Sequence, residues 1–170
     1  MPDKPDHQKA AEIVRDAGGT IVGRTRLQKV ACLLQLAGFE DGFRFGYHHY
    51  GPYSEELTDA IRVAEAFDLV SAEDRRASWG GVYTVFTSTP ASQADDRTRF
   101  AQAAAQIDSI ELELAATAAY LAVVEKAPNP WEETARRKPD KVADGRLERA
   151  KTAYRQLHAM KTRKKLPKIA

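Results

Sequence analysis

The segment from Tyr47 to Tyr53 (Tyr-His-His-Tyr-Gly-Pro-Tyr) concentrates side chains that could coordinate or contact another molecule. His48 and His49 are adjacent, and adjacent residues of an extended chain point to opposite faces, so they are poorly placed to share one metal ion. We expect one of the two histidines to form a hydrogen bond within the turn and the other to face solvent. The tyrosines have two interpretations that the sequence leaves open. They form a rigid contact surface, because Tyr is enriched at binding hot spots, or they cap the core.

Other reactive residues give no sign of catalysis. Cys32 lies between apolar neighbours in the middle of an expected helix, which indicates an inert core thiol. The chain has no nucleophile elbow, no Walker loop and no dinucleotide-binding glycine pattern. Paired acids such as Glu55-Glu56 stand near expected helix starts, where the helix dipole explains them. We therefore expect a protein that is not an enzyme and needs neither a metal nor another cofactor.

Three cations, Arg24, Arg26 and Lys29, stand at the start of a helix expected over residues 25–37. The dipole disfavours cations at that end, so a partner, a tertiary ion pair or solvent must accommodate them. We expect them to pair with carboxylates or phosphates of a partner, bidentately for arginine. The predicted partner-binding residues are Arg24, Arg26, Lys29, His48, His49, Tyr50 and Tyr53.

Length and composition point to one soluble domain. The chain has 170 residues, of which 43% are hydrophobic and 29% charged, as in an ordinary globular protein. It has one cysteine, no apolar run long enough to cross a bilayer and no apolar leader near its start. These features predict a cytoplasmic protein and argue against disulfide scaffolds, zinc fingers and membrane spans.

Hydrophobic periodicity predicts a mainly α, α+β protein. Residues 7–90 read as a winged-helix-like region, followed by a helical region over 91–160 packed on it as one compact unit. The expected helices of the first region cover 7–17, 25–37 and 54–67, with Ser54 as N-cap. Its expected strands cover 43–47, 69–70 and 82–87, with turns at 48–53 and 73–78. Helices in the second region are expected at 95–107, 110–126, 131–137 and 142–160. Residues 1–6 and the basic tail 161–170 are expected to be disordered.

Charge is distributed unevenly. Residues 145–170 carry nine Lys/Arg and one acid, for a net charge of +8, which leaves −6 on the rest of the chain. A winged helix reads DNA with its third helix, yet here that helix is acidic and 16 residues separate it from the second. Both features count against recognition of the DNA major groove by the third helix. Possible phosphate contacts are Arg75, Arg76, Lys161, Arg163, Lys164 and Lys165.

Three segments together resemble a known family. They are Gly23-Arg24-Thr25-Arg26-Leu27-Gln28-Lys29, then Tyr50-Gly51-Pro52-Tyr53-Ser54, then Glu113-Leu114-Ala115-Ala116-Thr117. Their order and spacing, over about residues 9–160, are similar to the YwgA-like family of small bacterial proteins. They also resemble the C-terminal domain of the DarG antitoxin and, more distantly, the Panacea domain of SocA-like antitoxins.

The resemblance implies a non-enzymatic module that binds a partner protein. Its role would be that of an antitoxin or of an accessory to phage defence. The DarG macrodomain has no counterpart here, so any such role would act through binding alone. The acidic body would suit a basic, nucleic-acid-handling partner, such as a toxin. The alternative is a winged-helix transcription regulator that contacts DNA, aided by the basic tail.

Overall fold

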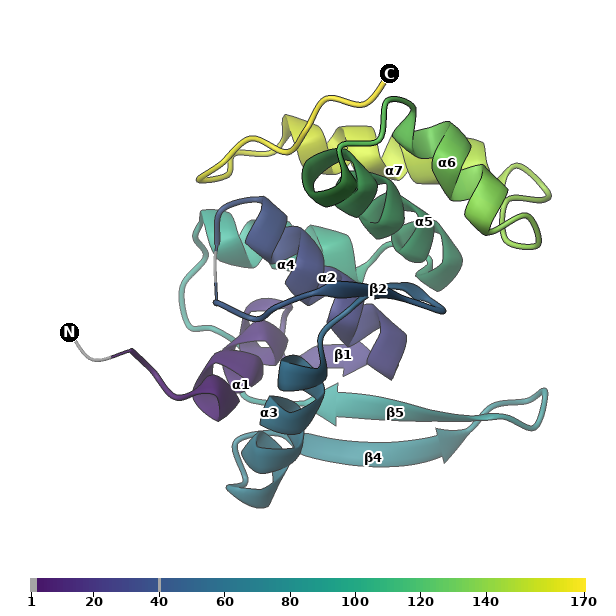
Figure 1. The fold of residues 1–170 in the computed structure, drawn as a ribbon. Helices are drawn as coiled ribbons and strands as arrows, with labels where there is room; N and C mark the ends of the chain where they lie inside the picture. Colours follow the sequence, from purple (N-terminus) through teal and green to yellow (C-terminus); the bar gives the residue numbers. More distant parts are fainter. Residues whose placement is uncertain (1–2, 40) are drawn as a thin grey trace.

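Helices dominate the architecture, as the sequence predicted. The computed structural model describes residues 3–39 and 41–170, and within these ranges it contains seven α-helices, one π-helical turn and five short strands (Figure 1). The first half comprises α1 (Asp6–Asp16), β1 (Thr20–Val22), α2 (Arg24–Leu36), β2 (Gly46–His48), β3 (Gly51–Tyr53), α3 (Glu55–Ala66), β4 (Ser71–Arg76) and β5 (Val82–Thr87). The second comprises α4 (Asp96–Ala105), α5 (Ser109–Tyr120), the π-helix η1 (Leu121–Glu125), α6 (Pro130–Arg137) and α7 (Arg146–Ala159).

A three-stranded antiparallel sheet with order β1-β5-β4 lies beside α1 and α3. The sequence predicted β5 with its observed bounds but missed β1, whose three residues are too few to show a period. The charged turn expected over 73–78 was wrong, because β4 continues to Arg76. Charged residues are tolerated in this outer strand because their side chains reach solvent. One of them, Asp74, also accepts a 2.7 Å hydrogen bond from the Thr84 hydroxyl of β5.

A second, two-stranded sheet is formed by β2 and β3, which pair Tyr47 with Pro52 and His48 with Gly51. The sequence predicted a strand over 43–47 and a turn over 48–53. The observed strand begins at Gly46, and only His49 and Tyr50 form the turn between β2 and β3. Phe43 is instead a buried core residue. Gly51 has φ +88°, a conformation that favours glycine and permits this tight reversal.

The hydrophobic core is continuous across both halves of the chain. At its centre α5 packs against α2 and α7, and every α5 residue from Leu112 to Tyr120 is buried. The helix predicted to run to Lys126 changes to the π-helix η1 at Leu121 and ends at Lys126, which adopts a left-handed conformation. The last helix begins at Arg146 rather than at residue 142. No helix in the described ranges is both long and apolar enough to cross a membrane.

The basic tail is not free, which corrects the expectation of disorder over 161–170. Leu166 is only 2% exposed and belongs to the core. The Lys164 amide donates a 2.9 Å bond to the Ala37 carbonyl, and the Tyr154 hydroxyl donates to the Pro167 carbonyl. Burial of one leucine thus anchors a segment whose lysines remain in solvent.

The expected disorder of residues 1–6 falls partly outside the described residues, because 1 and 2 are not among them. Asp6 already belongs to α1, and Lys4 forms a 2.8 Å salt bridge with Glu12. This contact ties the segment before α1 to the helix itself.

Candidate functional site

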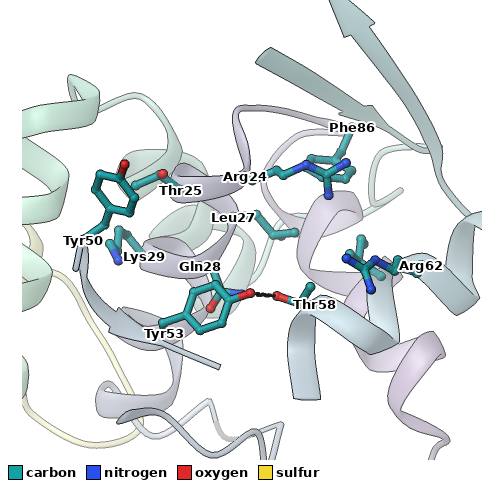
Figure 2. Close-up of a pocket in the computed structure, with 11 residues that line it drawn as sticks. Arg24, Thr25, Leu27, Gln28, Lys29, Tyr50, Tyr53, Thr58, Arg62 and Phe86 are labelled. Carbon is teal, nitrogen blue, oxygen red and sulfur yellow. Dashed lines mark hydrogen bonds between the residues drawn. The ribbon is translucent and has the colours of Figure 1, made fainter. Parts of the chain in front are cut away.

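A pocket of about 290 Å³ lies between the start of α2, the β2–β3 hairpin, α3 and β5. Figure 2 shows its lining side chains, which come from all four elements. The lining residues are Arg24, Thr25, Leu27, Gln28, Lys29, Tyr50, Tyr53, Thr58, Ile61, Arg62 and Phe86. Three of them are cations and none is a carboxylate, so the pocket has a positive electrostatic character.

The N-terminus of α2 adds to this positive character. The N-cap residue is Gly23, which offers no side-chain acceptor, and the first turn contains no acid. The Arg24 guanidinium lies 5.7 Å from the centre of the Phe86 ring, a cation–π geometry that holds it over the sheet. An uncapped helix start and an arginine on the same pocket wall both favour an anion there.

Lys29 is the least exposed cation of the pocket, with 1% of its surface accessible. Its ammonium group donates a 2.7 Å hydrogen bond to the carbonyl of Pro52 in β3. Burial lowers the pKa of Lys29 to about 8, and the nearby Glu113 carboxylate only partly offsets this effect. Lys29 therefore joins α2 to the hairpin, and this contact requires its buried position.

Gln28 joins α2 to the start of α3. Its side-chain amide donates to the Ser54 carbonyl at 3.0 Å and accepts from the Ser54 amide at 2.8 Å. It also donates to the Thr58 hydroxyl, which shares a 2.6 Å hydrogen bond with the phenol of Tyr53 (Figure 2). Ser54 caps α3 through its hydroxyl, as predicted. This network fixes the orientation of Tyr53 at the pocket wall.

A buried ionic cluster supports the hairpin from the α5 side. Lys138 lies 2.9 Å from the Glu113 carboxylate, and Lys141 contacts both oxygens of that carboxylate at 2.7 Å. Lys138 also donates to the His49 carbonyl at 3.3 Å. Two lysines therefore share one buried carboxylate, and one of them also holds the turn of the hairpin.

Tyr50 is the most exposed side chain of the hairpin pocket wall, with 60% of its surface accessible. The Lys141 ammonium lies 4.7 Å from the centre of its ring. Tyr47 is half-buried beneath the Arg137 guanidinium, at 4.7 Å from ring centre to guanidinium carbon. The two interpretations of the tyrosines therefore apply to different residues: Tyr47 packs inward, whereas Tyr50 presents a ring to solvent.

The structure brings four of the seven predicted partner-binding residues to one pocket: Arg24, Lys29, Tyr50 and Tyr53. Lys29 nevertheless corrects the prediction that it reaches a partner at the surface, because it is buried. Arg26 is a second correction. Its guanidinium donates to the carbonyls of Val22, Ala105 and Ile107, so it ties α2 to β1 and the end of α4.

His48 and His49 are exposed on the hairpin but do not line this pocket. The ring of His48 lies 5.0 Å from the ring of Tyr53, on the side of a separate hollow that includes Arg44 and Glu56. Within the described ranges, no group of three metal-ligating side chains is placed to hold an ion.

The predicted nucleic-acid contacts are split between two ends of the molecule (Figure 1). Arg75 and Arg76 are exposed on β4, and Arg75 pairs with Glu73. The side chains of Lys161, Arg163, Lys164 and Lys165 are exposed on the anchored tail, and Lys165 donates to the carbonyl of His158. The two groups therefore form no continuous basic surface.

Sequence reasoning missed Arg62 and Phe86 as pocket residues, and it missed the role of Glu113. Arg62 lies in the acidic helix expected over 54–67, and Phe86 in the strand expected over 82–87. A signal for Glu113 was present, since it stands between Leu112 and Leu114 in a helical stretch that is mostly apolar. Such an acid is buried only when it is paired.

The structure gives a physical reason for the three motif segments. Gln28 and Lys29 of the first segment bond Ser54 and Pro52 of the second. Glu113 of the third segment binds the lysine that holds the turn of the hairpin. The motifs thus meet around β2–β3, and Gln28, Lys29 and Glu113 are the motif side chains that hold it.

Comparison with known proteins gives one relative. No protein-family model matches the chain. It is 32% identical over 78 residues to the uncharacterized protein YwgA of Bacillus subtilis (strain 168), an alignment that covers 46% of this chain and 45% of YwgA. The aligned part thus spans under half the length of that relative. The chain is therefore similar to YwgA over part of its length, which supports the YwgA-like resemblance of its motifs.

Proposed function

We propose that this protein is a non-enzymatic regulatory module that binds a partner protein through the tip of the β2–β3 hairpin and the adjoining pocket. The observation that carries the proposal is the exposed ring of Tyr50 on a hairpin whose backbone is held from inside. Lys29 and Lys138 bond the carbonyls on either side of Tyr50–Gly51, at Pro52 and His49. A rigid aromatic side chain loses little conformational entropy on binding, which is the property of a hot-spot residue.

The motif geometry supports the same role. Gln28, Lys29 and Glu113 are buried and bonded to other parts of the chain, so they position the hairpin. Arg24 and Tyr50 stay exposed at the pocket and are free to contact another molecule. The resemblance to antitoxin domains and the acidic body favour a basic partner protein, in an antitoxin-like or phage-defence role.

The experiment is affinity capture from the native host, followed by calorimetry with the purified captured protein. Tyr50→Ser removes the exposed ring, and Trp79→Ser serves as the matched control because Trp79 is 80% exposed on the distant β4–β5 turn. We expect to capture a specific protein that binds the native chain and the Trp79 variant equally well. Its affinity for the Tyr50 variant should be at least tenfold lower. Recovery of nucleic acid without a specific protein, or equal binding by both variants, would contradict the proposal.

A DNA-binding regulator is the second candidate, favoured by the order of elements. Setting the β2–β3 hairpin aside, the order of helices α1, α2 and α3 and the sheet order β1-β5-β4 support this candidate, in which β4–β5 would be the wing. Trp79, Arg75 and Arg76 are exposed on that wing. The outer face of α3 opposes this function, since Glu55, Asp59 and Glu65 are exposed there.

Binding to random duplex DNA over a range of salt concentrations tests this candidate. Because Leu166 anchors the tail, its charges are best removed by substitution of the exposed cations by Gln and not by truncation. Base-specific binding that survives the tail substitutions but is lost in Arg75→Gln/Arg76→Gln would favour the regulator. If only the tail substitutions abolish DNA binding, the binding is a property of the tail and not of the folded domain.

A further inference from the structure

The charge balance around the pocket is incomplete. Arg24 forms no salt bridge among the described residues, and Arg62 has only Asp59 at 3.9 Å, with both side chains largely in solvent. No Asp or Glu lines the cavity. The cations therefore face the pocket without a negative group of the protein opposite them.

The uncompensated positive charge is most unfavourable for the folded protein at Lys29, because this lysine is buried. The nearest carboxylate is Glu113, and both of its oxygens are already engaged by Lys141, with one also bonded to Lys138. Three lysines thus surround one carboxylate, and Lys29 satisfies one of its protons with the Pro52 carbonyl. Burying an ammonium group is unfavourable unless a counter-charge is near. An anion in the adjoining cavity would supply it.

The shape of the cavity restricts the ligand that can supply this charge. A volume of about 290 Å³ corresponds to about ten water molecules in the liquid, which leaves room for one ring with an attached acid group. Leu27, Ile61 and Phe86 give the wall an apolar part, and Tyr50 offers an exposed ring at its edge. The start of α2, which no side chain caps, adds its first backbone amides near Arg24, the first residue of the helix.

We propose that the pocket binds a small organic anion, consisting of a flat ring that carries one phosphate or carboxylate group. The acid group is held by Arg24 and the start of α2, and the ring packs on the apolar wall formed by Leu27, Ile61 and Phe86. This proposal concerns the pocket that also adjoins the protein contact proposed above, but it rests on the unbalanced charges of Arg24 and Arg62 and not on that contact. A ligand here would also brace α2 against the hairpin and so change the surface that Tyr50 presents.

The test is isothermal titration calorimetry of the purified full chain at low and moderate salt. Phenyl phosphate represents the phosphate source and benzoate the carboxylate source, with phenol and benzamide as their uncharged counterparts. We expect at least one anion to bind more tightly than about 1 mM and at least tenfold more tightly than its uncharged counterpart. Preference for one anion identifies the acid group; similar binding of both supports their shared chemistry.

The variants assign the binding to this pocket. Arg24→Gln should weaken the anion at least tenfold, whereas Arg155→Gln, an exposed arginine on α7, should leave it unchanged. Both side chains lie at the surface, and circular dichroism verifies that each variant folds. The proposal is overturned by absence of binding by both anions, by equal binding of charged and uncharged compounds, or by an Arg24 variant that binds like the native chain. The protein-capture experiment depends on Tyr50 and the anion titration on Arg24, so the failure of one proposal is distinguishable from the failure of the other.

Discussion

Gly51 lies directly against Thr117: a Cβ atom added to Gly51 would be 2.4 Å from the Thr117 hydroxyl oxygen. That oxygen is buried and has no hydrogen-bond partner in the described part of the chain. The backbone of β3 thus approaches α5 as closely as the missing side chain allows. This contact links the second motif segment to the third and places the tip of the hairpin over the ionic cluster.

Substituting Gly51 by Ala should destabilise the protein by more than about 2 kcal/mol. A left-handed conformation costs an L-residue about 1–2 kcal/mol, and the clash with Thr117 adds to it. Gly80→Ala is the matched control, because Gly80 has φ +93° but nothing within 4 Å of an added Cβ. Chemical denaturation measures both. Equal losses for the two variants would mean that the approach to Thr117 is unimportant.

Removing the negative charge of Glu113 should lower the free energy of unfolding far more than removing that of Glu111, two residues earlier in α5. Glu113→Gln leaves buried Lys138 without its carboxylate partner, and breaking a buried pair costs about 3–5 kcal/mol. Glu111 pairs at 3.0 Å with the exposed Arg149, so Glu111→Gln should cost less than about 1 kcal/mol. Similar unfolding free energies for the two variants would refute the structural role of the cluster.

The lowered pKa of Lys29 predicts a rise in stability with pH. Below about pH 8 the amine is protonated in both states, so the penalty for burying its charge is fully present. Between about 8 and its ordinary value of 10.5, the folded protein releases the proton while the unfolded chain keeps it. Stability therefore increases with pH in this window, by on the order of 3 kcal/mol.

Comparison with Lys29→Met isolates this contribution, since the raised tyrosine pKa values of Tyr47, Tyr120 and Tyr154 affect both proteins alike. The charged or titratable groups near Lys29 are Glu113, Lys138, Lys141 and Cys32, whose thiol pKa is raised to about 12 by burial. Urea denaturation at pH 7 to 10.5 should show the extra rise in the native chain only. Parallel pH profiles would contradict a charged, buried Lys29.

The anchored tail predicts a core-like response at Leu166. Leu166→Ala should lower the unfolding free energy by about 2–5 kcal/mol, because it removes a buried side chain. Arg163→Ala, at an exposed position of the same segment, should change it by less than about 0.5 kcal/mol. Thermal or chemical denaturation distinguishes them, and equally mild effects would support the free tail that the sequence suggested.

The elements with strong local signals could be predicted from the sequence. Helices α1, α2 and α3, strand β5 and the Ser54 cap follow from periodicity and from side chains that act on their immediate neighbours. Short or charged elements could not. Strand β1 has three residues, and β4 is a strand only because β5 pairs with it, so no pattern within either segment specifies it.

For the site, the sequence by itself determined which residue types gather: Arg24 and Lys29 in one segment, Tyr50 and Tyr53 in another. Only the tertiary structure decided which of them face solvent. Lys29 and Arg26 turn inward because carbonyls of distant elements accept their hydrogen bonds, whereas Arg24 and Tyr50 remain at the pocket. The burial of a charged side chain depends on partners far along the chain, and such partners become neighbours only when the chain has folded.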